Sequence, residues 1–299
     1  MIHTPEHIRA AIAEGRPVVA LESTVISHGL PYPHNLELAR DMEAEIRAAG
    51  AIPATIGVVK GVPTVGMSDE EVIHFAQEKD ILKLSRRDIG HCVAHGRSGA
   101  TTVAATMALA ALAGVKVFAT GGIGGVHRGA RDTWDVSADM TELSRTQVLV
   151  VCAGAKSILD LPATLEYLET AGVPVLGYGT SELPAFYSAE SGLAVPARAD
   201  TPDEAAAIWK AHEALGGGSG LLVTVPPPAE VALPHSAIDG AIERALAKAE
   251  AAGVRGQAVT PFLLASVAEE TEGESMRTNI ALLRQNACIA AAIAASIAS

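Results

Sequence analysis

Short, mostly apolar runs recur along the chain and alternate with segments whose apolar residues repeat at the helical period. These runs span residues 17–21, 80–85, 115–120, 146–154, 173–179 and 220–226. Strands that are apolar on both faces are typical of a parallel sheet that helices cover on both sides. The alternation therefore predicts βαβ units around a largely parallel sheet.

Helical periodicity predicts the segments between these runs. We expect helices that open at Pro5 and at Ser68, and helices over residues 35–49, 98–114, 161–171, 201–215, 235–252 and 260–298. Residues 52–66 predict two short strands around Lys60 and Gly61. The sequence has no fixed-period repeat, low-complexity tract or linker, so we predict one domain spanning residues 1–299.

The composition limits the core and the partners. Hydrophobic residues make up 49% of the 299 residues and aromatic residues only 3%, so Ala, Val, Leu and Ile must form most of the core. The formal net charge of -12 opposes non-specific binding to nucleic acid or to an anionic membrane. A small anionic substrate is still possible, because a few donors can hold it locally.

The cysteines and the chain ends favour a reduced, cytoplasmic setting. Cys92, Cys152 and Cys288 are odd in number and widely spaced, which predicts neither a zinc site nor a disulfide framework. Residues 1–15 lack the basic and apolar regions of a signal peptide. The Ala-rich segment 287–299 is short, so we expect a buried or subunit-contacting helix rather than a membrane span.

Glu22 lies at the carboxyl end of the first apolar run, at the edge where parallel sheets of this kind bind ligands. Burial there raises the pKa of a carboxylic acid, so Glu22 could donate a proton near neutral pH. A structural acid that accepts hydrogen bonds from turn amides would leave the same pattern.

Lys156 follows another apolar run, at residues 146–154, and small residues flank it. Partial desolvation would favour the neutral amine, which is a nucleophile. Most lysines, however, are simply solvated.

Other polar segments follow strands as well. Lys83, with Arg86 and Arg87, could bind phosphate or form a solvated basic cluster. Residues 98–102 open a predicted helix, where amides and hydroxyls could bind an anion or simply cap the helix. The loop 121–129, GGIGGVHRG, lacks the third glycine and the apolar helix of a dinucleotide site. Its amides could cradle a single phosphate beside His127, or the loop could be a tight turn.

Asp135, Ser137 and Asp139 occupy alternate positions. In an extended segment their oxygens would point to one side, which suits Mg²⁺ or Mn²⁺ or sugar hydroxyls. An N-cap with surface acids before a helix explains the same spacing. Taken together, a proton donor, an amine, a possible cation and a phosphate pocket favour Schiff-base chemistry on a sugar phosphate, without identifying the substrate.

Six sequence blocks resemble the pseudouridine-5′-phosphate glycosidases of the indigoidine synthase A-like family. They are ALESTVISHGLPYPHN (20–35), KLSRRDIG (83–90), GATTVAAT (99–106), FATGGIGGVHRGARDTWDVSADM (118–140), VCAGAKSILD (151–160) and MRTNIALLRQNA (276–287). The blocks occur in order over nearly the whole chain. The resemblance implies a three-layer α/β/α fold and a homotrimer.

The resemblance also implies reversible cleavage of pseudouridine 5′-phosphate to uracil and ribose 5-phosphate. Glu22 would be the proton donor, and Lys156 would be the nucleophile that forms a Schiff base with the opened sugar. Asp135 would hold Mn²⁺ through water, with Mg²⁺ or another divalent ion as an alternative. The implied substrate contacts are Lys83, Thr102, Val103, His127, Ser137, Ala138, Asp139 and Asn279.

Three other functions compete with this hypothesis, one of which is a role in blue-pigment biosynthesis, where similar proteins occur. Another Schiff-base sugar-phosphate lyase or aldolase would use similar groups but would release only carbonyl fragments. A sugar-phosphate-binding protein without turnover would keep the pocket, and removal of Lys156 would then leave binding intact.

Overall fold

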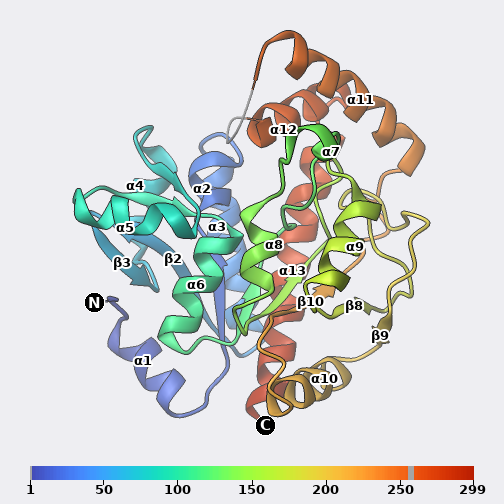
Figure 1. Cartoon of the computed structure of the whole chain (residues 1–299). Coiled ribbons are helices and arrows are strands. Elements are labelled where there is room, and N and C mark those ends of the chain that lie inside the picture. The colour runs from blue at the N-terminus through green and yellow to red at the C-terminus, as the bar shows by residue number, and fades with distance from the viewer. Residues whose placement is uncertain (1, 255–258) are drawn as a thin grey trace.

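One sheet runs through the centre of the computed structural model, which describes residues 2–254 and 259–299 (Figure 1). Its strands are β1 (Val18–Glu22), β2 (Ile52–Val59), β3 (Val62–Val65), β4 (Leu82–Leu84), β5 (Gly99–Thr101), β6 (Val117–Ala119), β7 (Leu149–Cys152), β8 (Val175–Tyr178), β9 (Ala197–Ala199) and β10 (Leu221–Thr224). Within the described residues the order is β4-β5-β2-β1-β6-β7-β10-β8-β9, and β3 pairs with β2.

Most neighbouring strands are parallel, as predicted. Every pair from β2 through β1, β6, β7, β10 and β8 to β9 is parallel. The exceptions lie at one edge, where β3 and β5 run antiparallel to β2 and β4 runs parallel to β5. The carboxyl ends of the parallel strands therefore meet along a single edge of the sheet.

Helices cover both faces of this sheet. They are α1 (Glu6–Ala13), α2 (Thr24–His28), α3 (His34–Ala48), α4 (Asp69–Gln77), α5 (Arg86–Ala94), α6 (Val103–Ala113), α7 (Ala130–Thr133), α8 (Ala138–Leu143), α9 (Leu161–Thr170), α10 (Pro202–Ala214), α11 (His235–Ala251), α12 (Val259–Glu270) and α13 (Glu274–Ala298). On one face α13 packs against α3, α10 and the central strands. On the other, α6 packs against α8, β1 and β2 (Figure 1). The predicted three-layer α/β/α fold is confirmed.

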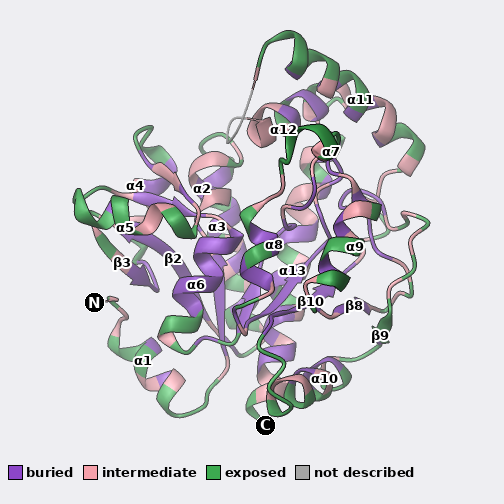
Figure 2. Ribbon diagram, in the orientation of Figure 1, coloured by how far each residue is buried: buried purple, intermediate pink, exposed green. Residues whose placement is uncertain are grey.

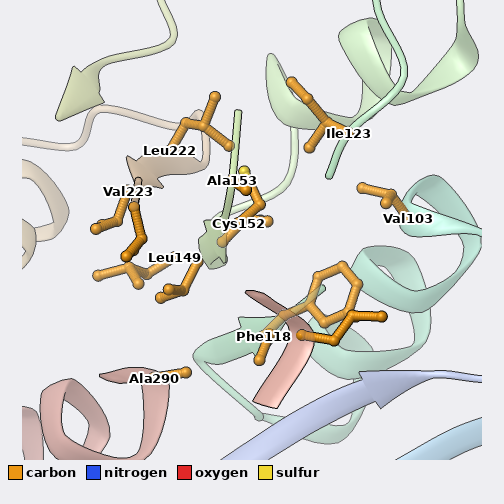
Figure 3. Close-up of a cluster of buried hydrophobic side chains, with 14 of the residues drawn as sticks. Val103, Phe118, Ile123, Leu149, Cys152, Ala153, Leu222, Val223 and Ala290 are labelled. Carbon is orange, nitrogen blue, oxygen red and sulfur yellow. The ribbon is translucent and has the colours of Figure 1, made fainter. Parts of the chain in front are cut away.

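The core is aliphatic, as the composition requires. Phe118, Leu149 and Val223 lie on the strands and are buried, with Val103 from α6 on one side and Ala290 from α13 on the other (Figure 3). Figure 2 shows that burial extends along the strands and along the inner faces of the helices. The core contains few aromatic rings. Small residues such as Ala290 lie where the helices contact the sheet, so helices and sheet can pack closely.

The last helix, α13, is long and apolar enough to cross a membrane by length and composition. In this fold, however, Leu282, Asn286 and Ala291 are buried in the molecule, and α13 packs on β1, β6 and β7. It serves as a core helix, consistent with the packing role expected of the Ala-rich segment.

The helix predicted over residues 98–114 is wrong in its first turn. Residues 99–101 form β5, and α6 begins only at Val103. A Cβ atom at Gly99 would lie 2.5 Å from the Leu84 side chain, so β5 fits against β4 because Gly99 has no side chain. The Thr101 amide donates to the Ser23 hydroxyl at 2.9 Å. These tertiary contacts outweigh the local helical pattern.

The single helix predicted over 260–298 is also wrong, because it is two helices. Glu272 and Gly273 have positive φ values of 50° and 84°, which end α12 and redirect the chain into α13. The sequence patterns also missed α2, α5 and β9. At the start of α5 the Asp88 carboxylate accepts a hydrogen bond from the Ser85 amide at 2.9 Å. This helix-start signal was overlooked because the same residues were interpreted as a basic cluster.

Candidate active site

A cavity of about 430 Å³ lies at the carboxyl ends of the strands. Among its lining residues are all those predicted for the site: Glu22, Lys83, Thr102, Val103, His127, Asp135, Ser137, Ala138, Asp139, Lys156 and Asn279. They come from segments far apart in the chain, which the parallel sheet brings to one edge. α12 contributes Thr260, Pro261 and Leu264 to the same wall.

Glu22 ends β1 and points its carboxyl group into this cavity beside Thr120. The Thr120 hydroxyl donates a hydrogen bond to Glu22 Oε1. Burial raises the pKa of the Glu22 carboxyl above its usual value, while the positive charge of Lys156 and the Thr120 hydrogen bond oppose that rise. A raised pKa favours the protonated form of a carboxylic acid, which is the form that acts as a general acid.

Lys156 is held by the turn that follows β7. Gly154 adopts a φ of 83°, which favours glycine, and the Lys156 amide donates to the Ile123 carbonyl at 3.1 Å. The side-chain Nζ donates to the Gly122 carbonyl at 3.0 Å. The amine is therefore fixed in a partly buried position by a neutral acceptor, with the Glu22 carboxyl close enough for their charges to interact.

Lys83 supplies a second partly buried amine. Burial lowers the pKa of Lys83, and the positive charge of Lys156 lowers it further, while Glu22 and Asp139 oppose the shift. The three residues of the predicted basic cluster do not act together. Lys83 and Arg87 line the cavity, whereas the Arg86 guanidinium pairs with the buried carboxylate of Glu142.

Of the two interpretations of the alternating pattern at residues 135–139, the N-cap before a helix is confirmed and the extended segment is not. Ser137 is the N-cap of α8 and Asp139 lies inside that helix, so the segment is not extended. The Asp139 carboxylate accepts from the Ala104 amide at 2.9 Å and from the Gly124 amide at 2.8 Å. Asp139 therefore links α6 to the glycine-rich loop through two hydrogen bonds, and it also lines the cavity.

Several backbone amides of the glycine-rich loop donate hydrogen bonds within the protein. The amides of Ile123, Gly124, Val126 and His127 donate to other groups of the chain. A Cβ atom at Gly124 would lie 2.2 Å from the Ser137 hydroxyl, which explains the glycine. These four amides therefore cannot form the predicted phosphate cradle. Of residues 98–102, predicted either to bind an anion or to cap a helix, Thr102 is the N-cap of α6, and the Ala104 amide of that first turn donates to Asp139.

Asp135 and His127 lie together at the cavity. His127 Nδ1 is 3.9 Å from Asp135 Oδ2, and the Asp135 side chain is 49% exposed. No group of three or more His, Cys, Asp or Glu residues in the described part of the chain could hold a metal ion. Asp135 therefore fits a cation only with water as most of its ligands, an arrangement that Mg²⁺ and similar hard ions accept.

Three buried polar atoms in the cavity wall make no hydrogen bond to the described residues. They are His28 Nε2, Ser85 Oγ and Thr102 Oγ1. Buried polar atoms normally have partners, so these three are suited to meet a polar ligand. His28 and Thr120 were not predicted as site residues, although both follow strands whose carboxyl ends form the site.

Comparison with known proteins gives the family of this chain. The family described as indigoidine synthase A like protein matches residues 7–296. The chain belongs to this family. A pseudouridine-5′-phosphate glycosidase of Herpetosiphon aurantiacus is 66% identical over 297 residues, covering 99% of this chain and 98% of its own. Another from a Roseiflexus species is 67% identical over 294 residues, covering 97% and 94%.

Two solved structures share the fold. A prealnumycin C-glycosynthase in complex with ribulose 5-phosphate has a TM-score of 0.92 and 42% identity, covering 100% of this chain and 97% of its own. An indigoidine synthase A-like protein from Thermotoga maritima has a TM-score of 0.89 and 39% identity, covering 96% and 94%.

Proposed function

We propose that this protein cleaves the carbon–carbon glycosidic bond of pseudouridine 5′-phosphate reversibly, giving uracil and ribose 5-phosphate in pseudouridine catabolism. The names of relatives at 66% and 67% identity support this activity. The observation that carries it is the placement of an acid, Glu22, and an amine, Lys156, in one cavity, near enough for their charges to interact.

The bond to be broken explains the need for an amine. In pseudouridine the anomeric carbon is bonded to a carbon atom of uracil. In an ordinary glycoside it is bonded to oxygen, which a carboxylic acid can protonate as it leaves. The pair of carboxylates that most glycosidases use is therefore poorly suited to this reaction. Glu22 first protonates the ribose ring oxygen as its bond to the anomeric carbon breaks. Burial raises the pKa of Glu22, which favours the protonated form that this step requires.

Lys156 then forms the covalent intermediate. Its amine adds to the anomeric carbon of the opened sugar and loses a proton. When the bond between that carbon and C5 of uracil breaks, its electron pair stays on uracil, which takes up a proton. The nitrogen lone pair forms the C=N bond of a Schiff base, and water hydrolyses it to ribose 5-phosphate and free lysine.

Cavity groups account for recognition. Lys83 and the unpartnered hydroxyls of Ser85 and Thr102 supply polar contacts for the substrate. His127 and Asn279 lie on the same wall. Asp135 would hold Mn²⁺ through water molecules, and the ion would supply positive charge near the substrate oxygens. Mg²⁺ has the same preference for oxygen ligands.

We also propose that the protein is a cytoplasmic homotrimer. A homotrimer would bury exposed apolar side chains such as Leu112 and Leu215, which are 71% and 87% exposed. A cytoplasmic location accords with the three free cysteines, two of which are buried.

The decisive assay mixes the protein and Mn²⁺ with pseudouridine 5′-phosphate and separates the products by chromatography. We expect free uracil and ribose 5-phosphate in equal amounts. An aldolase or lyase would give carbonyl fragments without uracil, and a binding protein would give no product while retaining the ligand. Either result from a folded, metal-loaded sample would refute the proposal.

A further inference from the structure

Thr120 lies opposite Glu22 because β1 and β6 are parallel neighbours. In their register Leu21 pairs with Ala119, so the next residue on each strand is Glu22 and Thr120, respectively. The Thr120 side chain is 1% exposed and lines the active-site cavity. The sheet itself therefore sets the contact between the hydroxyl and the carboxyl group.

The backbone of Thr120 is fixed on both sides. Its amide donates to the Val151 carbonyl at 3.0 Å, on the neighbouring strand β7. Its carbonyl accepts from Asn286 Nδ2 at 2.9 Å, on the core helix α13. Asn286 is fully buried, so the position of the Thr120 hydroxyl is determined by the core rather than by a mobile loop.

We propose that Thr120 is a positioning residue that directs the catalytic proton of Glu22 to Oε2. The Thr120 hydroxyl donates to Oε1, so Oε1 is an acceptor. The acidic proton then belongs on Oε2, the oxygen left to face the substrate. With the proton on Oε1 instead, the acid would donate to Thr120 and could not reach the ring oxygen. This inference rests on the proposed role of Glu22.

The charged groups around Glu22 do not perform this task. Lys156, Lys83 and Asp139 act on the Glu22 carboxyl through their charges. The Thr120 hydroxyl instead contacts one particular carboxyl oxygen, Glu22 Oε1. The hydroxyl also stabilises the carboxylate form, so its loss must raise the pKa of Glu22 further.

The test compares Thr120→Val, which keeps the shape and removes the hydroxyl, with Thr120→Ser, which keeps the hydroxyl. We expect Thr120→Val to lower kcat for uracil release about 10- to 100-fold with little change in KM. The alkaline limb of its pH profile should move to higher pH. Thr120→Ser should restore the wild-type limb and most of kcat. Equal losses in the two variants, or an unmoved limb in Thr120→Val, would overturn the proposal.

A second measurement does not depend on turnover. Carbon-13 NMR of glutamate-labelled protein follows the titration of the Glu22 carboxyl, with Glu22→Gln to assign the signal. The Glu22 pKa should be higher in Thr120→Val than in wild type and should return in Thr120→Ser. An unchanged titration in folded Thr120→Val refutes the positioning role. Absence of uracil from wild-type enzyme would instead refute the proposed function, so the two failures are distinguishable.

Discussion

Two cavities of similar size lie among the described residues, and their charged groups differ. The active-site cavity has a volume of about 430 Å³ and the second cavity about 410 Å³. The second lies beyond the Lys156 loop, where it is lined by Arg128, Ser157 and residues of α11. Volume therefore does not distinguish the two.

The two cavities differ in how their charged side chains are paired and buried. In the second cavity Asp239 pairs with His235 at 2.8 Å, and Arg128 lies 3.8 Å from the same carboxylate. Asp160 accepts from the Ala163 amide as the cap of α9. In the active-site cavity, burial shifts the pKa of Glu22 upward and that of Lys83 downward. Buried groups whose environment disfavours their charge mark the site of proton transfer.

The largest expected effect comes from Lys156→Ala. The variant removes the nucleophile, so we expect uracil release to fall by at least about a thousandfold. Stopped assays with purified protein measure this loss. Lys156→Arg is the matched control, because it keeps the charge and should be equally inactive. Substantial activity in either variant would show that the nucleophile is another group.

Glu22→Gln should lower kcat by about a hundredfold or more, because glutamine cannot donate the proton. In wild-type enzyme, activity should decline as pH rises through the raised pKa of Glu22, since only the protonated acid is active. The pH profile of Glu22→Gln should lack this limb. A profile that keeps the limb would assign it to a different group.

The same substitution should also alter stability. Since folding raises the pKa of Glu22, the favourable contribution of its protonated form is complete at low pH and is lost as pH rises through the folded-state pKa. Glu22→Gln should therefore raise Tm relative to wild type at alkaline pH and have little effect at acidic pH. Thermal unfolding across pH measures this difference, and a Tm gain that is the same at every pH would contradict it.

The sequence alone predicted the sheet and the two proposed catalytic residues, but it did not predict every contact in the site. Apolar runs predicted the parallel sheet, and the rule that ligands bind at carboxyl strand ends located Glu22 and Lys156. The role of Asp139 was hidden, because the amides it accepts from belong to Ala104 and Gly124, which are distant in the chain. Thr120 was missed because its partner depends on the register of β1 and β6. Strand spacing alone does not give that register.

A smaller effect is expected at Lys83. Loss of a charge-assisted contact in Lys83→Met should raise KM about 10- to 100-fold, while Lys83→Arg should recover part of the affinity. Steady-state kinetics with pseudouridine 5′-phosphate separates KM from kcat. Complete loss of turnover in Lys83→Met, together with activity in Lys156→Ala, would exchange the roles of the two lysines.

Asp135→Asn tests the proposed cation. The substitution weakens a carboxylate that holds the ion through water, so about tenfold more Mn²⁺ should be needed for half-maximal activity. Titration of chelator-treated enzyme with Mn²⁺ measures this requirement. An identical Mn²⁺ dependence in wild type and variant would remove Asp135 from the metal site.

The smallest effect is expected in the second cavity. Asp239→Asn disrupts its pairing with His235, and we expect kcat and KM to stay within about twofold of wild type because neither residue lines the active-site cavity. This variant is the control for the whole comparison. A loss comparable to that of Glu22→Gln would contradict the distinction between the two cavities.

Chemical trapping at Lys156 tests the central claim most directly. Enzyme incubated with ribose 5-phosphate is treated with borohydride, digested and analysed by mass spectrometry. The proposed Schiff base predicts a reduced pentose-phosphate adduct on the peptide that contains Lys156, and none in Lys156→Ala. An adduct on Lys83 alone, or an active enzyme that yields no adduct at all, would contradict the account.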